Sequence, residues 1–290
     1  MTLPIHSISS PAHAASASNI GRVLLDMGKI TPENAEAVLR LQKEEGIRFG
    51  EAAMRLGFIT EKDIQVVLAR QFDYPYLHAA DARFAPQLVA AFQPFSPQVE
   101  ALRSVRSQLM LRWFAQGHRS LTVLALEPGD DGANLAANLA VVFSQLGERT
   151  LLVDGNLREP RQRGIFKLGQ RAGLSDVLAG RADLDAIAPV DAFVSLSLLG
   201  AGTLPPNPQE LLGRDTFQQT RETLERAYDV ILYDAPPLTE SADGLAIAAR
   251  TGGVLLVARR HVTRYEEIAA AADRIGQVGA SLLGTVLVEN

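Results

Sequence analysis

The stretch LALEPGDDGANLAANLAVVF, from Leu124 to Phe143, decides how this chain is expected to fold. An apolar run enters a Pro-Gly turn and is followed by a helix of small residues. This order is typical of a phosphate-binding loop, in which backbone N–H groups at a helix N-terminus face an anion. The loop has no lysine, serine or threonine, and it carries Asp130 and Asp131 instead. The sequence therefore predicts the shape of a phosphate loop without its usual charge.

Further apolar runs place this loop in a larger sheet. Segments long enough for helices separate most of the runs, and this alternation indicates a doubly wound, mostly parallel α/β sheet. Ligands of such sheets bind at the carboxyl ends of the strands, where Asp154 and Asp234 stand. Acids in this position usually serve Mg²⁺, so we predict both as catalytic and Mg²⁺-binding residues. The predicted strands are residues 121–126, 150–154, 194–200, 229–234, 253–258 and 282–288.

An internal repeat precedes the sheet. Its copies are NIGRVLLDMGKITPENAEAVLRLQ (19–42) and RFGEAAMRLGFITEKDIQVVLARQ (48–71), with five residues between them. Each copy has the pattern of a helix, a glycine stop and a second, capped helix. The stops are at Gly28 and Gly57, and the N-caps are Thr31 and Thr60. We predict a small all-helical domain built from two similar hairpins.

Composition limits the possible functions. The net charge of −5 argues against a broad nucleic-acid surface, and the absence of cysteine excludes disulfide and thiolate chemistry. No apolar run reaches the roughly 18–20 residues of a membrane span, so we expect a cytoplasmic protein without a span of its own. The expected organisation is a disordered leader (1–18), the helical domain (19–77), a linker (78–98) and the α/β domain (99–290).

Residues 96–290 resemble the cytoplasmic domain of bacterial tyrosine kinases that control exopolysaccharide chain length, relatives of the ParA/MinD P-loop ATPases. Four segments carry the resemblance: E-x-x-R-x-x-R before the first strand, residues 128–162, GTLPPNPQELL (202–212) and DVILYDAPPLTESADG (229–244). The resemblance implies ATP and Mg²⁺ as cofactors. It implies a homo-oligomer that meets a membrane chain-length determinant, or polysaccharide co-polymerase, at the inner membrane.

The same resemblance assigns residues to roles. The residues that it implies for oligomerisation are Glu100, Arg103 and Arg106. The residues that it implies for nucleotide binding are Gly129, Asp130, Asp131, Gly132, Ala133, Asn134, Arg158 and Asn207.

Departures from the family loop P-G-E-G-K-S/T suggest that the activity has changed. Gly132 stands in place of the lysine, Ala133 in place of the Mg²⁺-binding hydroxyl, and Asp131 in place of the second glycine. Such losses weaken ATP binding by about 3 kcal/mol or more, over ~100-fold. We therefore expect a kinase-like regulatory subunit, a pseudokinase with weakened or lost phosphotransfer. The alternatives are an active tyrosine autokinase and a cyclic di-GMP effector whose α/β domain is a scaffold.

The tandem repeat resembles the N-terminal domain of type II secretion and pilus-extension ATPases. Members with the full pattern bind cyclic di-GMP, whereas many relatives only dock other proteins. The lengths and spacer agree with that pattern, although Asn19 replaces its first arginine. Both functions stay open. The cyclic di-GMP candidates are Gly21, Leu24, Gly28, Gln42, Arg48, Gly50, Gly57 and Gln71.

Overall fold

The computed structural model describes residues 20–61, 63–64, 66–67, 82–129, 131–169 and 171–289. The chain divides into two compact units, Met1–Pro75 and Tyr76–Asn290, each with its own apolar core. The expected leader and two predicted site residues, Gln71 and Asp130, lie outside the described residues.

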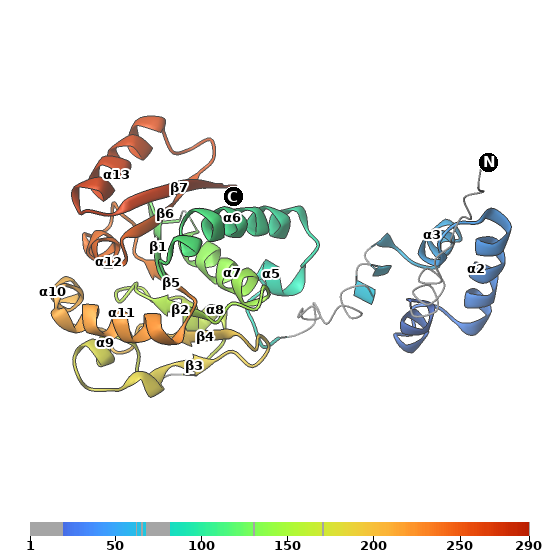
Figure 1. Cartoon of the computed structure of the whole chain (residues 1–290), viewed down its shortest axis with the longest axis horizontal. Coiled ribbons are helices and arrows are strands. Elements are labelled where there is room, and N and C mark those ends of the chain that lie inside the picture. The colour runs from blue at the N-terminus through green and yellow to red at the C-terminus, as the bar shows by residue number, and fades with distance from the viewer. Residues whose placement is uncertain are drawn as a thin grey trace, which may run out of the picture. The chain divides into compact units, whose positions relative to one another are not determined.

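The second unit is built on a seven-stranded sheet with the order β3-β4-β2-β5-β1-β6-β7 (Figure 1). Neighbouring strands are parallel except β3, which runs antiparallel to β4 at one edge. The strands are β1 (Ser120–Ala125), β2 (Thr150–Asp154), β3 (Ala188–Pro189), β4 (Leu196–Leu199), β5 (Val230–Ala235), β6 (Gly253–Arg259) and β7 (Ser281–Val288). The predicted α/β class is confirmed, and all six predicted strands are present. The seventh, β3, is too short to leave a pattern in the sequence.

Helices cover both faces of the sheet. Side chains of β1 alternate between two cores: Leu121 and Val123 pack toward α6 and α7, and Leu124 packs toward α12 and α13. One layer contains α5 (Val89–Phe92), α6 (Pro97–Arg112), α7 (Gly132–Ser144) and α8 (Gln162–Ile165). The other contains α9 (Leu174–Leu178), α10 (Pro208–Gly213), α11 (Asp215–Ala227), α12 (Asp243–Thr251) and α13 (Tyr265–Gln277). Short 3₁₀ helices, η1 (Phe114–Gln116) and η2 (Leu184–Ala186), complete the unit.

Part of the segment expected as a linker packs into this unit. Leu88, Ala90 and Ala91 are fully buried in the core under α7. The Asn138 side chain accepts a hydrogen bond from the Ala90 N–H (2.8 Å) and donates one to the Gln87 carbonyl (2.9 Å). Residues 84–92 therefore belong to the α/β unit, which corrects the expected linker over this range. Their apolar positions follow no long period, so the sequence pattern did not reveal them.

The single tryptophan joins α6 to the sheet. Its indole N–H donates to the Ser120 carbonyl at the start of β1 (2.9 Å), and its ring stacks on His118 with 3.6 Å between centroids. A Cβ atom on Gly253 would lie 2.6 Å from the Trp113 ring, so glycine is required where β6 passes the indole.

The helical unit contains α2 (Pro32–Glu45) and α3 (Phe49–Arg55), and residues 20–26 are also helical. Gly28 and Gly57 both have a positive φ, +64° and +70°, which closes the preceding helix as predicted. The Thr31 hydroxyl accepts from the Asn34 N–H (3.2 Å), which confirms the first predicted N-cap. Thr60 and Asp63 exchange equivalent bonds in the second copy. The two copies thus share the same stops and caps.

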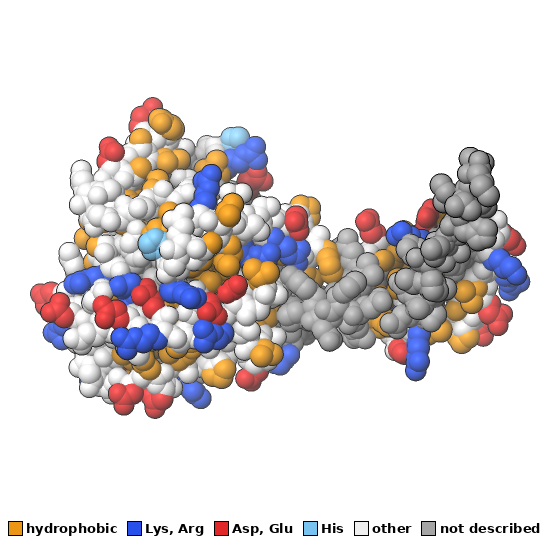
Figure 2. Space-filling view, in the orientation of Figure 1, with side chains coloured by type: hydrophobic (Ala, Val, Ile, Leu, Met, Phe, Trp, Pro, Cys, Tyr) orange, Lys and Arg blue, Asp and Glu red, His pale blue; other side chains and the backbone are white. Residues whose placement is uncertain are grey.

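Charged side chains of both signs are mixed on the visible face of the α/β unit (Figure 2). A surface of this kind offers no extended basic stripe for nucleic acid on that face. Within the described segments, no helix combines the length and apolar character needed to cross a bilayer.

Asp229 ties together the starts of three neighbouring central strands. Its carboxylate accepts hydrogen bonds from Arg149, before β2 (2.8 Å), and from Arg119, before β1 (3.0 Å). The hydrogen bond from Arg149 is the main reason that the pKa of Asp229 falls to about 2. A carboxyl group whose pKa is lowered on folding stabilises the fold above its unfolded pKa, and this contribution is lost as the pH falls toward the folded pKa.

We predict that Asp229→Asn lowers the stability of the α/β unit by about 1 kcal/mol at neutral pH, because the arginines that it pairs with are partly exposed. The deficit should shrink between about pH 4 and pH 2, where the wild-type carboxylate becomes protonated. Calorimetric melts across this range check the prediction. Asp273→Asn, on an exposed position of α13, is the matched control. If Asp229→Asn were less stable than the wild type by the same amount at neutral pH and near pH 2, the prediction would be wrong.

Candidate functional site

Two buried acids lie side by side at the carboxyl edge of the sheet. Asp154 ends β2 and Asp234 lies opposite it in β5, and neither side chain is more than 2% exposed. The Gly155 N–H donates to the Asp234 carbonyl (2.8 Å), and a Cβ atom at position 155 would lie 2.8 Å from that oxygen. Glycine therefore allows the two strand ends to approach closely. The structure brings together the two acids that the sequence placed at this edge.

The pair holds its protons more tightly than ordinary acids do. Burial raises the pKa of Asp154 well above its usual range, and the charge of Asp234 raises it further. Burial also raises the pKa of Asp234, to about 7. Two adjacent carboxylates in a dry environment cannot both stay ionised without compensation. At neutral pH the pair therefore carries less than its full negative charge.

Gln162, which the sequence did not indicate, lies against both acids. Its side chain is fully buried and its amide nitrogen donates to Asp234 Oδ2 (2.7 Å) and to the Ala133 carbonyl (2.9 Å). Its backbone N–H donates to Asp154 Oδ2 (2.9 Å). Gln162 lies in a polar, arginine-rich stretch without periodicity, so no pattern marked it out. It joins the ends of β2 and β5 to the first turn of α7.

The phosphate-like loop leads from β1 into α7. Gly129 has φ +88° and Asp131 has φ +59°, and α7 begins at Gly132. Positive φ favours glycine, so the backbone at Asp131 suits the glycine that the family has there. Asp131 Oδ1 instead accepts a hydrogen bond from the Asn134 side chain (2.7 Å). The loop thus keeps the backbone of a phosphate loop but places its own carboxylate at the start of the helix.

The cavity beside this loop is small and acidic. Its volume is about 50 Å³, whereas small-molecule sites usually occupy roughly 300–1,000 Å³. Arg161 is the one basic side chain among its described lining residues, and Arg259 donates to the Pro128 carbonyl nearby (3.3 Å). The acids that line it are Glu127, Asp131, Glu159, Asp234 and Glu240.

Arg158 and Asn207, two predicted nucleotide contacts, lie elsewhere. The Arg158 guanidinium forms an ion pair with the buried carboxylate of Asp243, at the start of α12 (2.7 Å). Asn207 is exposed before α10, where its side chain contacts Glu210 (3.3 Å). Neither residue lines the loop cavity. Their assignment to the nucleotide stays a prediction.

The predicted oligomerisation motif lies on α6. The half-buried Arg103 pairs with the exposed Glu100 (3.1 Å). Arg106 instead donates to the Val142 carbonyl of α7 (2.8 Å) and so helps to hold α6 against its neighbour. Part of the motif therefore has a role within the chain.

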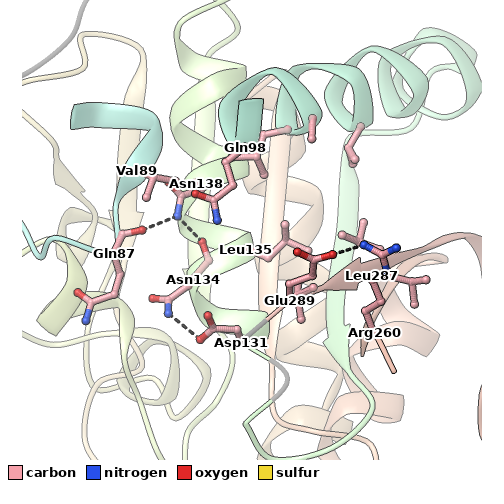
Figure 3. A pocket seen from close by; sticks show the side chains of 15 residues that line it. Gln87, Val89, Gln98, Asp131, Asn134, Leu135, Asn138, Arg260, Leu287 and Glu289 are labelled. Atoms are coloured by element: carbon pink, nitrogen blue, oxygen red, sulfur yellow. Dashed lines mark hydrogen bonds and ion pairs between the residues drawn. The ribbon is translucent and has the colours of Figure 1, made fainter. Parts of the chain in front are cut away.

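A larger cavity of about 750 Å³ lies on the other side of the first turns of α7 (Figure 3). Apolar side chains of α6 and β7 form much of its wall, including Leu102 and Val286. Asp131 lines both cavities, and at the far end Arg260 is paired with Glu289. This cavity is large enough for a small organic molecule, but Arg260, the one arginine among its described lining residues, already has an acidic partner.

Asp176 anchors the loop that contains residues 202–212. Its carboxylate accepts from the N–H groups of Gly173 (3.1 Å) and Thr203 (3.0 Å) and pairs with Arg181 (3.0 Å). Burial alone would raise the pKa of Asp176, but these hydrogen bonds and the arginine outweigh it and lower the pKa.

The described residues do not fit the phosphates of Mg-ATP. The loop supplies no lysine and no hydroxyl, and its lining is mainly acidic. Across the described ranges, no three His, Cys, Asp or Glu side chains are grouped as a metal site. Asp154 and Asp234 remain the residues predicted to face Mg²⁺.

We predict opposite effects for the same substitution at two buried acids. Asp154→Asn should raise the melting temperature near neutral pH in EDTA, by a few °C, because it removes an ionisation that folding disfavours. Asp176→Asn should lower it by a similar amount, because folding favours that carboxylate. Calorimetry on the full chain measures both shifts. A loss of stability in both variants would contradict the account of the acid pair.

Comparisons with known proteins agree with this architecture. No family profile matches the chain. The tyrosine-protein kinase wzc of Salmonella typhimurium is 31% identical over 69% of this chain and 28% of its own length. YwqD of Bacillus subtilis, also a tyrosine-protein kinase, is 29% identical over 71% of this chain and 87% of its own. The kinase domain of Escherichia coli tyrosine kinase Etk matches 76% of this chain and 86% of its own, with 27% identity and a TM-score of 0.68.

The chain thus matches less than one third of wzc but most of YwqD. Sequence relatives and solved kinase domains both point to the family that the motifs indicated, and its parallel sheet and phosphate-like loop are present here. This chain belongs to the bacterial (BY-type) tyrosine kinase family with a P-loop fold.

Proposed function

We propose that this chain is a regulatory subunit of exopolysaccharide polymerisation and export, a tyrosine-kinase-like protein in which ATP phosphotransfer is weakened or lost. It would act at the cytoplasmic face of the inner membrane by assembling with a membrane chain-length determinant. The exposed carboxylate of Glu100 on α6, which is paired with the half-buried Arg103, supports assembly of several copies.

The phosphate-like loop carries this proposal. Phosphoryl transfer depends on positive groups that meet the charge of the transferred phosphate. Here acids outnumber bases around the loop, and Asp131 lies at the start of α7, where a phosphate would sit. The carboxylate and the phosphate would compete for the same positive end of the helix dipole.

We propose protein docking, rather than cyclic di-GMP binding, as the role of the helical unit. Several candidate residues have structural tasks: Gly28 and Gly57 end helices, and Leu24 is fully buried in the core. A Cβ atom on Gly21 would meet the Phe49 ring at 3.0 Å, and one on Gly50 would meet Ile64 at 2.8 Å. Packing thus explains these positions without a ligand. Leu25, Leu39, Met54 and Leu56 remain exposed for a protein partner.

A calorimetric titration with Mg-ATP tests the kinase part. We expect no binding tighter than about 1 mM for the wild type. The triple variant Asp131→Gly, Gly132→Lys, Ala133→Thr restores the family loop and should bind at least ~100-fold more tightly. A Cβ atom at position 132 lies 3.0 Å from the Ala125 side chain, so the change needs only a small shift.

The triple variant with Asp234→Asn added is the matched control: it should keep the part of the gain that comes from the lysine and lose any part that depends on Mg²⁺. Binding of Mg-ATP to the wild type below about 100 µM would overturn the proposal, because some other group would then replace the missing lysine.

For the helical unit, we expect cyclic di-GMP to leave the melting temperature unchanged in the wild type and in Arg48→Ala. Thermal scans with and without the nucleotide measure this. A shift in the wild type that disappears in Arg48→Ala would show that the exposed arginine binds the nucleotide.

A further inference from the structure

The side-chain amide of Gln162 occupies the space between the acid pair and the first turn of α7. An amide –NH₂ group has two N–H donors, and both are used here, one by Asp234 Oδ2 (2.7 Å) and one by the Ala133 carbonyl (2.9 Å). The side chain is fully buried, so this arrangement is not a loose surface contact.

The two acceptors differ in kind. Asp234, near the end of β5, is at the position where the kinase family places an acid for a divalent cation, whereas the Ala133 acceptor is the main-chain carbonyl of the residue whose side chain is a cation-binding hydroxyl in the family. Mg²⁺ requires oxygen ligands at about 2.0–2.1 Å. The amide nitrogen stands between the two oxygens and presents partly positive hydrogens to both. A cation cannot share that space with an N–H donor, so Gln162 would have to leave before a metal could enter.

Gln162 also supplies the cross-links that a bound cation would otherwise provide. Its side chain connects β5 to α7, and its backbone N–H connects to Asp154 at the end of β2. We propose that Gln162 is a built-in substitute for the divalent cation, which holds the nucleotide site of this chain closed in a metal-free state. The inference rests on the proposed loss of phosphotransfer and gives it a structural cause at this site.

Two buried oxygens around Gln162 are not satisfied by hydrogen bonds from the described part of the chain, so they are possible ligands for a cation and allow the proposal to be tested. Asp154 Oδ1 and Gln162 Oε1 are buried and have no hydrogen-bond partner within the described residues. Asp154 Oδ1 would still be available to a cation if the Gln162 amide moved aside.

The test uses the full chain with MgCl₂ or MnCl₂ and no nucleotide, at matched ionic strength. We expect the wild-type melting temperature to change by less than about 1 °C between EDTA and about 10 mM MgCl₂. Gln162→Ala should melt at least about 5 °C lower and regain about 3 °C or more in MgCl₂, because the vacated space admits a cation. Gln162→Leu removes the donors but fills the space, so it should melt lower without recovery in MgCl₂.

Three outcomes would overturn the proposal: a rise of the wild-type melting temperature in MgCl₂, an unchanged melting temperature in Gln162→Ala, or no recovery of that variant in MgCl₂. If Gln162→Ala does not fold, Mn²⁺ titration of the wild type followed by electron paramagnetic resonance decides. Binding of Mn²⁺ to the wild type with a Kd below about 1 mM would refute the proposal that Gln162 takes the place of the cation. Since no nucleotide is present, metal binding here would leave the proposed function intact, and Mg-ATP binding tests that function separately.

Discussion

The pairing of two buried acids at the carboxyl edge of β2 and β5 governs the site. Parallel pairing sets Asp154 opposite Asp234 in a dry environment, and the hydrogen bond from Gly155 to the Asp234 carbonyl prevents the strand ends from separating. Such a pair needs protons, hydrogen-bond donors or a cation beside it. Gln162 provides the donors, and in doing so it fixes where the segment after β2 and the start of α7 meet.

Several charged side chains around the phosphate-like loop have partners within the chain. Asp131 lies at the positive end of the α7 dipole. Arg158 neutralises the buried Asp243, and Arg163 donates to the carbonyl of Ala172. A loop that binds a triphosphate keeps its positive groups available for the ligand. Here the acids nearest the helix come from the protein. Of the arginines beyond β2, Arg158 and Arg163 bond to other parts of the chain, and Arg161 lines the loop cavity.

The sequence alone predicted the features that recur along the chain and those that mark the end of a helix or strand. Apolar runs predicted six strands, and the acids after two of them met at one edge because parallel strands align their carboxyl ends. Glycine stops and threonine caps were predicted because they act locally. Gln162 and Asp243 could not be found this way, since each acts on residues distant in sequence. The burial of residues 84–92 was not predicted for the same reason. It depends on α7, whose Asn138 side chain is hydrogen-bonded to this segment.

Trp113 makes the two units optically distinguishable. It is the only tryptophan of the chain and lies in the α/β unit, between Ser120, His118 and Gly253. Tryptophan emission therefore follows the packing of α6 against β1 and β6 within the α/β unit. Far-ultraviolet circular dichroism detects both units, because both contain helices. Recording the two signals on one sample separates the unfolding of the kinase-like unit from that of the repeat without cutting the chain.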